Sequence, residues 1–98
     1  MADVQITRSE DGLKYLLTVD GAEVGRIESG LKDGKVVLYH TEVDRAVEGE
    51  GLGSALVKGT LDDIRARGLE VVPLCSFVRA YIARHPEYAD LVAGSAET

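Results

Sequence analysis

Hydrophobic and polar residues alternate through the first part of the chain in the manner of β-strands. Asp-Gly pairs at 11–12, 20–21 and 33–34 separate the alternating segments. Asp-Gly between apolar runs is a strong signal for a tight hairpin turn, because both residues accept positive φ. The pattern therefore predicts four strands, each antiparallel to its neighbour, over residues 4–9, 13–19, 22–29 and 35–43.

The fourth predicted strand holds the longest apolar run of the chain. Its alternation is incomplete, which indicates a strand covered on both faces. Towards the end of this strand, a period of two places His40 and Glu42 on one face. The same period places Tyr39, Thr41 and Val43 on the other face.

Beyond residue 51 the pattern changes to the helical period. Residues 52–67 carry a broad apolar stripe, and Gly68 follows as a residue that ends helices. The stripe consists of Leu52, Leu56, Val57, Leu61 and Ile64. A helix between two strands implies a right-handed crossover, so residues 70–75 are predicted as a strand parallel to the fourth.

The end of this fifth strand predicts a local opening of the sheet. Pro73 has no N–H to donate to a neighbouring strand, so we expect pairing to loosen there and a cleft to form. Ser76 then suits the N-cap of a last helix, and Pro86 marks the end of that helix. The expected fold is α+β: four antiparallel strands, a helix, a parallel fifth strand and a C-terminal helix.

Length and composition narrow the class of protein. The chain has 98 residues, so we expect one domain over residues 1–98. A formal net charge of −6 argues against a nucleic-acid binder or a protein held on an anionic membrane. A single cysteine, no visible signal peptide and no apolar stretch of membrane-spanning length together favour a cytoplasmic location.

The loop between the fourth strand and the first helix predicts a ligand site. Gly49, Gly51 and Gly53 stand at alternate positions, and glycine lets the backbone turn tightly and approach a ligand closely. The first N–H groups of the following helix point outwards at the positive end of its dipole. This arrangement suits a phosphate or pyrophosphate. The alternative is a glycine-rich turn without a ligand.

The order of the elements and four sequence stretches resemble the GNAT superfamily of acetyl-CoA-dependent N-acetyltransferases, in particular its minimal members of about this length. The stretches are HTEV at 40–43, EGEGLGS at 48–54, VPLC at 72–75 and YIARHPEY at 81–88. The second stretch falls on the family's pyrophosphate loop, Gln/Arg-x-x-Gly-x-Gly/Ala. The resemblance implies a truncated GNAT-like acyl-CoA N-acyltransferase fold, acetyl-CoA or coenzyme A as the cofactor, and an amine as the acceptor.

The resemblance also implies roles for individual residues. Thr41 and Val43 lend backbone groups to the pantetheine arm, and an N–H near Val43 serves as the oxyanion donor. Phe77 and Tyr81 flank the arm. Tyr81 stands where many family members place the acid that protonates the leaving thiolate, and its alternative is a core aromatic. The amides that hold the pyrophosphate belong to Gly49, Glu50, Gly51, Leu52, Gly53 and Ser54.

The base and the nucleophile are each left with two interpretations. Glu42 and His40 are the candidates for the base that deprotonates the amine, directly or through water; the alternative is a pair of solvated strand residues. Cys75 stands between a strand end and a helix N-terminus, where the helix dipole stabilises a thiolate. It either carries the acetyl group as a thioester or packs as an apolar residue beside the cofactor.

Two departures from the family pattern bear on function. The loop begins with Glu48 in place of Gln or Arg, and Glu50 adds a second acid. Both carboxylates must point away from a pyrophosphate, and Arg45 and Lys58 are available to offset them. Only a turn joins the first two strands, where full-length members carry helices that wall the acceptor site. We therefore expect an open site for a small amine or a protein lysine.

A second class of function stays open at this point: a module that binds CoA or acyl-CoA with little or no turnover. We expect no metal. The oligomeric state is left open.

Overall fold

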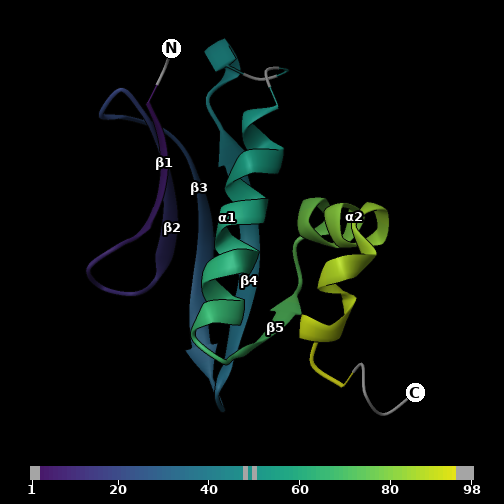
Figure 1. The fold of residues 1–98 in the computed structure, drawn as a ribbon. Helices are drawn as coiled ribbons and strands as arrows, with labels where there is room; N and C mark the ends of the chain where they lie inside the picture. The colour runs from purple at the N-terminus through teal and green to yellow at the C-terminus, as the bar shows by residue number, and fades with distance from the viewer. Residues whose placement is uncertain (1–2, 48, 50, 95–98) are drawn as a thin grey trace.

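The computed structural model of the chain describes residues 3–47, 49 and 51–94. Its centre is a sheet whose strand order follows the chain order (Figure 1). β1 to β4 are antiparallel neighbours, and β5 is parallel to β4. The strands are β1 (Val4–Arg8), β2 (Lys14–Val19), β3 (Ala22–Lys32), β4 (Lys35–Val43) and β5 (Glu70–Pro73).

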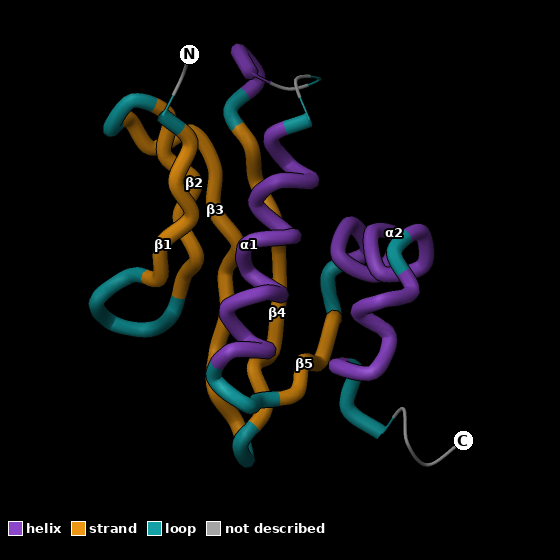
Figure 2. Tube along the Cα trace, viewed as in Figure 1, coloured by secondary structure: helices purple, strands orange, loops and turns teal. Residues whose placement is uncertain are grey.

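Two α-helices and a 3-10 helix pack together on one side of this sheet (Figure 2). They are α1 (Leu52–Ala66), α2 (Ser76–Arg84) and η2 (Pro86–Leu91), and a shorter 3-10 turn, η1 (Arg45–Val47), follows β4. The predicted α+β order of strands and helices is confirmed. Within the described part of the chain, no helix combines the length and the apolar character needed to span a membrane.

The tightest turns have the backbone geometry that Asp-Gly predicts. All four residues at positions 20–21 and 33–34 have positive φ, between 51° and 85°. Paired positive φ values belong to two-residue type I′ hairpins, which match the twist of the strands they connect. The connection between β1 and β2 is longer, and the Asp11 carboxylate accepts the Leu13 N–H at 2.9 Å within it.

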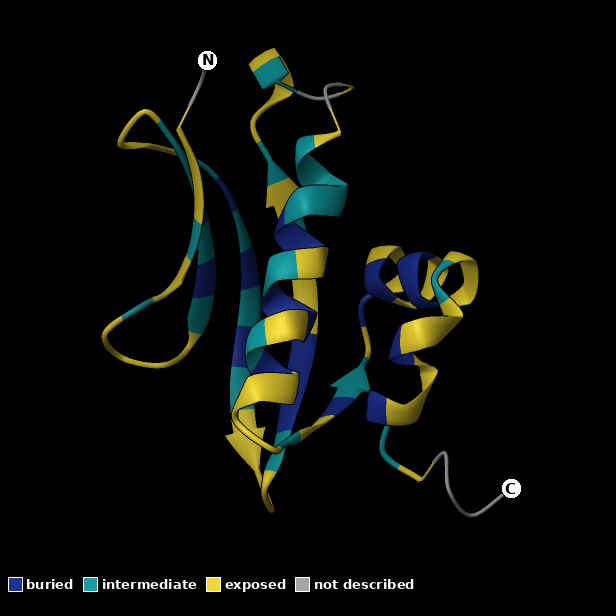
Figure 3. Cartoon of the chain, viewed as in Figure 1, coloured by how far each residue is buried: buried dark blue, intermediate teal, exposed yellow. Residues whose placement is uncertain are grey.

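The core lies between the sheet and α1 (Figure 3). The predicted stripe of α1 faces it, with Leu52 at its partly buried end. Gly59 allows α1 to approach β1 closely, because a Cβ there would lie 2.9 Å from the Cβ of Ile6. The fully buried side chains include Tyr15, Leu17, Ile27 and Leu38 from the strands and Leu56, Val57, Leu61 and Ile64 from α1.

A β-bulge in β4 places Tyr39 on the face of the sheet opposite to the predicted one. The register between β3 and β4 shifts at residues 28–29, which leaves Tyr39 as the extra residue. Its ring lies over Gly30, where a Cβ would be 3.3 Å from the ring, on the face of the sheet opposite α1. The prediction that Tyr39 shares a face with Thr41 and Val43 is therefore wrong, because a strict period of two does not count the bulged residue.

β4 and β5 separate beyond Leu38 and Pro73, which are their last paired residues. The predicted loosening at Pro73 is confirmed, but its cause is different. The Leu74 N–H points to β4 and donates to the Leu38 carbonyl at 3.0 Å, so the nitrogen of Pro73, one residue earlier, faces the outer edge. The Cys75 N–H donates to the same carbonyl at 3.0 Å, and this convergence turns the chain away from β4.

Two of the three predicted helix termini are confirmed. α1 ends next to Gly68, which has φ 70°, and α2 ends just before Pro86. The predicted N-cap of α2 is wrong by one residue. Cys75, in extended conformation, holds the N-cap position, and Ser76 is already helical. The Cys75 carbonyl accepts the first helical hydrogen bond, from the Arg79 N–H at 3.1 Å.

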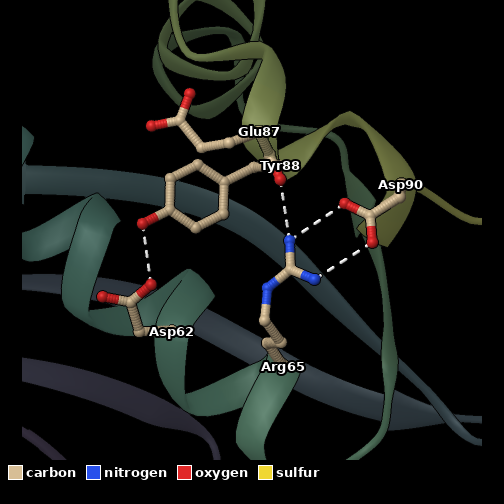
Figure 4. A network of polar contacts seen from close by, with 5 residues as sticks. All are labelled: Asp62, Arg65, Glu87, Tyr88 and Asp90. Atoms are coloured by element: carbon tan, nitrogen blue, oxygen red, sulfur yellow. Dashed lines mark hydrogen bonds and ion pairs between the residues drawn. The ribbon is translucent and has the colours of Figure 1, made fainter.

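Polar side chains fasten η2 to α1 (Figure 4). The Arg65 guanidinium donates to both carboxylate oxygens of Asp90, at 3.0 and 2.9 Å, and to the Glu87 carbonyl at 2.8 Å. The Tyr88 hydroxyl donates to Asp62 at 2.7 Å. Because η2 follows α2 directly, these contacts also hold α2 in place beside α1.

Candidate active site

The end of β4 and the start of α2 meet at Cys75. Its side chain is buried, with 8% of its surface exposed. The Thr41 hydroxyl from β4 lies 3.2 Å from the Cys75 sulfur. The two residues face each other across the point where β4 and β5 separate, so the thiol lies at the inner end of that opening.

The Thr41 hydroxyl and nearby backbone amides favour the charged form of the Cys75 sulfur. Burial raises the pKa of the Cys75 thiol, but the Thr41 hydroxyl and the backbone N–H groups of Val78, Phe77 and Thr41 act in the other direction and bring the pKa below its usual value. The thiol makes no helix-capping hydrogen bond in the strict geometric sense, so the α2 amides act on it as oriented dipoles. A cysteine in such surroundings is a better nucleophile near neutral pH than a free one.

The backbone of β4 beyond the separation is available on one edge. The Asp44 N–H donates to Val24 of β3 at 2.7 Å, so by alternation the backbone groups of Thr41 and Val43 point away from β3. They face the side that β5 has left, since the last pair is formed by Leu38 and Pro73. Over the described residues, this edge of β4 has no strand partner beyond Leu38.

The glycine loop supplies a second element of a nucleotide site. Gly49 and Gly51 have φ 88° and 77°, which L side chains rarely adopt. Gly51 is the N-cap of α1 without any side-chain hydrogen bond, and no acidic residue stands in the first turn of that helix. The amides of Leu52, Gly53 and Ser54 thus begin a helix whose N-terminus suits an anion.

Gly53 has a different task from the other two glycines. A Cβ at this position would lie 3.0 Å from the ring of Phe77, which is half-exposed at the start of α2. Gly53 therefore allows the two helix starts to approach each other. Phe77 thus contacts the start of α1 and lies two residues after Cys75 in the chain.

The sequence also predicts two acids in the glycine loop and two cations that offset them. Glu48 and Glu50 lie outside the described residues. Of the two cations expected to offset them, Lys58 is already paired with Asp62 at 2.8 Å. Arg45 lies in η1, beside the loop.

Tyr81 lies one helical turn after Phe77 and is buried, with 4% of its surface exposed. Its ring stacks on His85 at 3.9 Å between centroids, and the His85 Nδ1–H donates to the Tyr81 carbonyl at 2.9 Å. Burial raises the pKa of Tyr81, so its hydroxyl keeps its proton at physiological pH. No hydrogen bond joins this hydroxyl to the residues that the structure describes.

The two candidate bases lie on the other side of β4. We call the face of the sheet opposite α1 the open face. The His40 Nε2 lies 3.2 Å from one carboxylate oxygen of Glu42, and Arg26 donates to the other at 3.0 Å. The side chains of His40, Glu42 and Arg26 are each at least one-third exposed on this face. Glu42 also lines a hollow of about 240 Å³ together with Glu23 and Asp44.

The structure thus brings Thr41, Cys75 and Phe77 together on the helix side of the opening and places His40 and Glu42 on the open face. Sequence reasoning assigned only backbone groups to Thr41 and missed its hydroxyl. The strand period placed Thr41 on the face opposite His40 and Glu42, and the structure turns that face towards the helices. Its contact with Cys75 depends on the crossover between β4 and β5, for which the sequence carries no local signal.

Comparisons with known proteins agree with this architecture. A sequence model described as GCN5-related N-acetyl-transferase matches residues 14–91. No curated protein matches the chain.

Two solved structures share the fold. A GCN5-like protein from Staphylococcus aureus superposes with a TM-score of 0.69 and 21% identity, over 94% of this chain and 90% of that one. The ribosomal-protein-S18-alanine N-acetyltransferase from Escherichia coli gives a TM-score of 0.63 and 16% identity, over 89% of this chain and 76% of that one. The family match covers most of the chain, and the curled mixed sheet has the family's form. The chain therefore belongs to the GCN5-related N-acetyltransferases, a family whose reaction is acyl transfer from acetyl-CoA.

Proposed function

We propose that this protein is an acetyl-CoA-dependent N-acetyltransferase that acts on a small amine or a lysine side chain. The observation that carries the proposal is the opening between β4 and β5, which ends at Leu38 and Pro73 and has Cys75 at its inner end. The bare N-terminus of α1 follows the C-terminal end of β4, beyond this opening. In acetyl-CoA the pyrophosphate and the thioester lie at opposite ends of an extended molecule. The helix N-terminus suits the pyrophosphate, and the opening with Cys75 suits the thioester.

Acetyl-CoA, when bound, supplies an acetyl group activated as a thioester. The α1 amides of Leu52, Gly53 and Ser54 hold the diphosphate, together with the loop residues before them. Backbone groups of Thr41 and Val43 bind the pantetheine arm along the free edge of β4. Phe77 packs against that arm from α2.

The proton transfers need one base and one acid. Glu42 or His40 accepts the proton of the amine, which approaches from the open face. Tyr81 donates a proton to the leaving thiolate, a role that suits a hydroxyl whose pKa is raised by burial. A backbone N–H near Val43 stabilises the developing oxyanion.

Cys75 either accepts the acetyl group before the amine does or only lines the site. The lowered pKa of its thiol supports the first role. Its burial at 8% exposure is also what a packed cysteine shows. Intact-mass measurement after incubation with acetyl-CoA distinguishes them, because an acetyl-enzyme carries the mass of one acetyl group and the Cys75→Ala variant cannot.

Steady-state release of CoA with a panel of amines and lysine peptides tests the function itself. We expect turnover with at least one acceptor and calorimetric binding of acetyl-CoA. Binding without turnover for any acceptor would favour the second candidate, a CoA-binding module. Absence of binding at millimolar acetyl-CoA would overturn both.

The Cys75→Ala variant separates the two chemical routes. Loss of turnover with intact acetyl-CoA binding supports the acetyl-cysteine. Unchanged turnover removes the nucleophile and leaves direct transfer to the amine.

A further inference from the structure

We propose that Thr41 is a positioning residue for Cys75: its hydroxyl donates a hydrogen bond to the sulfur, favours the thiolate form and holds the sulfur at the inner end of the opening between β4 and β5. The inference deepens the proposed function, because it rests on Cys75 being part of the acetyl-transfer site. It assigns a task to a side chain for which the family resemblance suggested backbone contacts only.

The Thr41 Oγ1 and the Cys75 Sγ are 3.2 Å apart, within the usual range for a hydrogen bond to sulfur. The two residues are 34 positions apart in the chain. Thr41 pairs with Ile27, a fully buried residue, so its side chain must point to the helix side of the sheet.

The ionisation state of the sulfur decides the direction of this hydrogen bond. Either atom can be the donor when the thiol is neutral, but only the hydroxyl can donate to a thiolate. The backbone N–H groups of Phe77, Val78 and Thr41 act on the thiol in the same direction and lower its pKa. Since these dipoles favour a negative sulfur, the hydroxyl is the donor in the contact between Thr41 and Cys75.

Charged side chains on the neighbouring elements have other partners than the sulfur. From α2, the Arg79 guanidinium donates to the carbonyls of Pro73 and Leu74 at 3.2 and 2.7 Å. From α1, Lys58 is paired with Asp62 at 2.8 Å. From β4, His40 lies on the open face against Glu42. The side chain that donates to the sulfur is therefore the neutral Thr41, not a cation.

The experiment measures the reactivity of the thiol and needs neither acetyl-CoA nor an amine. The rate of alkylation of Cys75 by iodoacetamide is followed between pH 5 and pH 10. Cys75 is the only cysteine of the chain, so the reaction reports one site. The apparent pKa of the thiol is read from the midpoint of the pH profile.

Three variants decide the outcome. Thr41→Val removes the hydroxyl and keeps the shape, and we expect the thiol pKa to rise by about one unit and alkylation at pH 7 to slow about tenfold. Thr41→Ser retains the hydroxyl and should restore the wild-type profile to within about twofold in rate. Thr60→Val is the matched control, since Thr60 is a buried threonine of α1 whose hydroxyl has no partner within the described chain.

A wild-type profile in Thr41→Val would overturn the proposal, and so would a Thr41→Ser variant that behaves like valine. A lowered pKa in Thr41→Val would show that the hydroxyl accepts from a neutral thiol, which also overturns it. If the valine variant does not fold, Thr41→Ala takes its place.

Failure of the proposed function is detected by a different measurement, the release of CoA. A protein that shows the expected alkylation shifts but releases no CoA with any amine keeps the Thr41 assignment and loses the transferase activity.

Discussion

The ring of Phe77 on α2 lies so close to Gly53 on α1 that a Cβ on the glycine would be 3.0 Å from it. Both residues belong to helix starts that border the proposed cofactor groove. Because Phe77 is half-exposed, its ring has room to move away from a larger side chain. The contact therefore links the glycine loop to the helix that carries Cys75.

The Gly53→Ala variant should weaken CoA binding without loss of stability. Alanine is favoured over glycine inside a helix by up to about 1 kcal/mol, which offsets the cost of displacing Phe77. The displaced ring enters the path of the pantetheine arm, so we expect a rise in Kd of several-fold by calorimetry with an unchanged unfolding midpoint.

A double-mutant cycle with Phe77→Ala checks this cause. Once the ring is absent, Gly53→Ala should have no further effect on Kd. Additive effects of the two substitutions would mean that Gly53 acts on the ligand directly and not through Phe77.

Two tyrosines of the C-terminal segment should respond in opposite ways to removal of the hydroxyl. The Tyr88 hydroxyl is bonded to Asp62 at 2.7 Å, so Tyr88→Phe should cost about 1 kcal/mol of unfolding free energy. A loss of this size lowers Tm by about 4–8 °C in a domain of this length. Turnover at a temperature well below Tm should change little.

Tyr81→Phe should leave stability unchanged and lower turnover, because its hydroxyl has no hydrogen bond to the described residues and is the proposed acid. Thermal unfolding and CoA release, measured on both variants, check the pair of predictions. Equal loss of stability in the two variants would contradict the assignment of Tyr81. Full turnover in Tyr81→Phe would transfer the role of the acid to another group.

The link between Arg65 and Asp90 predicts a pH-dependent stability. The Arg65 hydrogen bonds lower the pKa of the Asp90 carboxyl below its usual value. A carboxyl with a lowered folded-state pKa stabilises the fold above its unfolded pKa, which is about 4, and this contribution is lost as the pH falls through the folded value.

Arg65→Met should therefore be less stable than wild type at pH 7, and the difference should shrink as the pH falls below about 4, leaving the part that comes from the hydrogen bond to the Glu87 carbonyl. Urea titrations from pH 3 to pH 7 measure the difference. Asp90→Asn should produce a similar loss at pH 7, with little further effect in combination. A difference that stays constant with pH would point to lost packing of the arginine stem on Tyr88, whose ring centroid lies 5.9 Å from the guanidinium carbon.

Replacement of Glu42 tests the proposed base on the open face. Glu42→Gln keeps the shape but cannot accept a proton, so we expect kcat to fall by about 10²–10⁴-fold while the Kd for acetyl-CoA stays the same. Glu28→Gln on the neighbouring strand is the matched control for a change of charge on the same face. A similar fall of kcat in both variants would indicate an effect of the negative charge on this face and not of one base. Full activity in Glu42→Gln would favour His40 as the base.

The strands and their turns were predictable from the sequence because their signals are local. Asp-Gly favours positive φ at two successive positions, and the structure has this geometry at 20–21 and 33–34 but not at 11–12, where only Gly12 has positive φ. The stripe of α1 follows from the helical period alone. Gly68 and Pro86 act on the backbone at their own positions, so both helix ends were also correctly placed.

The errors arise where distant parts of the chain meet. The bulge at Tyr39 depends on the register of β3 against β4, and the Leu38 carbonyl, which accepts two successive amides, moves the N-cap of α2 to Cys75. The contact of Thr41 with Cys75 likewise follows from the crossover. Sequence spacing brought these residues to the same end of the sheet but did not determine which side-chain atoms touch.

The outer edge of β5 has few free backbone groups with which another strand could pair. The Val71 carbonyl already accepts the Ala93 N–H at 2.9 Å, and the next backbone group on that edge, at Pro73, lacks a hydrogen to donate. A proline on an edge strand blocks the addition of further strands. Growth of the sheet into dimers or fibrils is thus disfavoured at β5, and β1, at the opposite end of the strand order, is the edge at which self-association by strand pairing would begin.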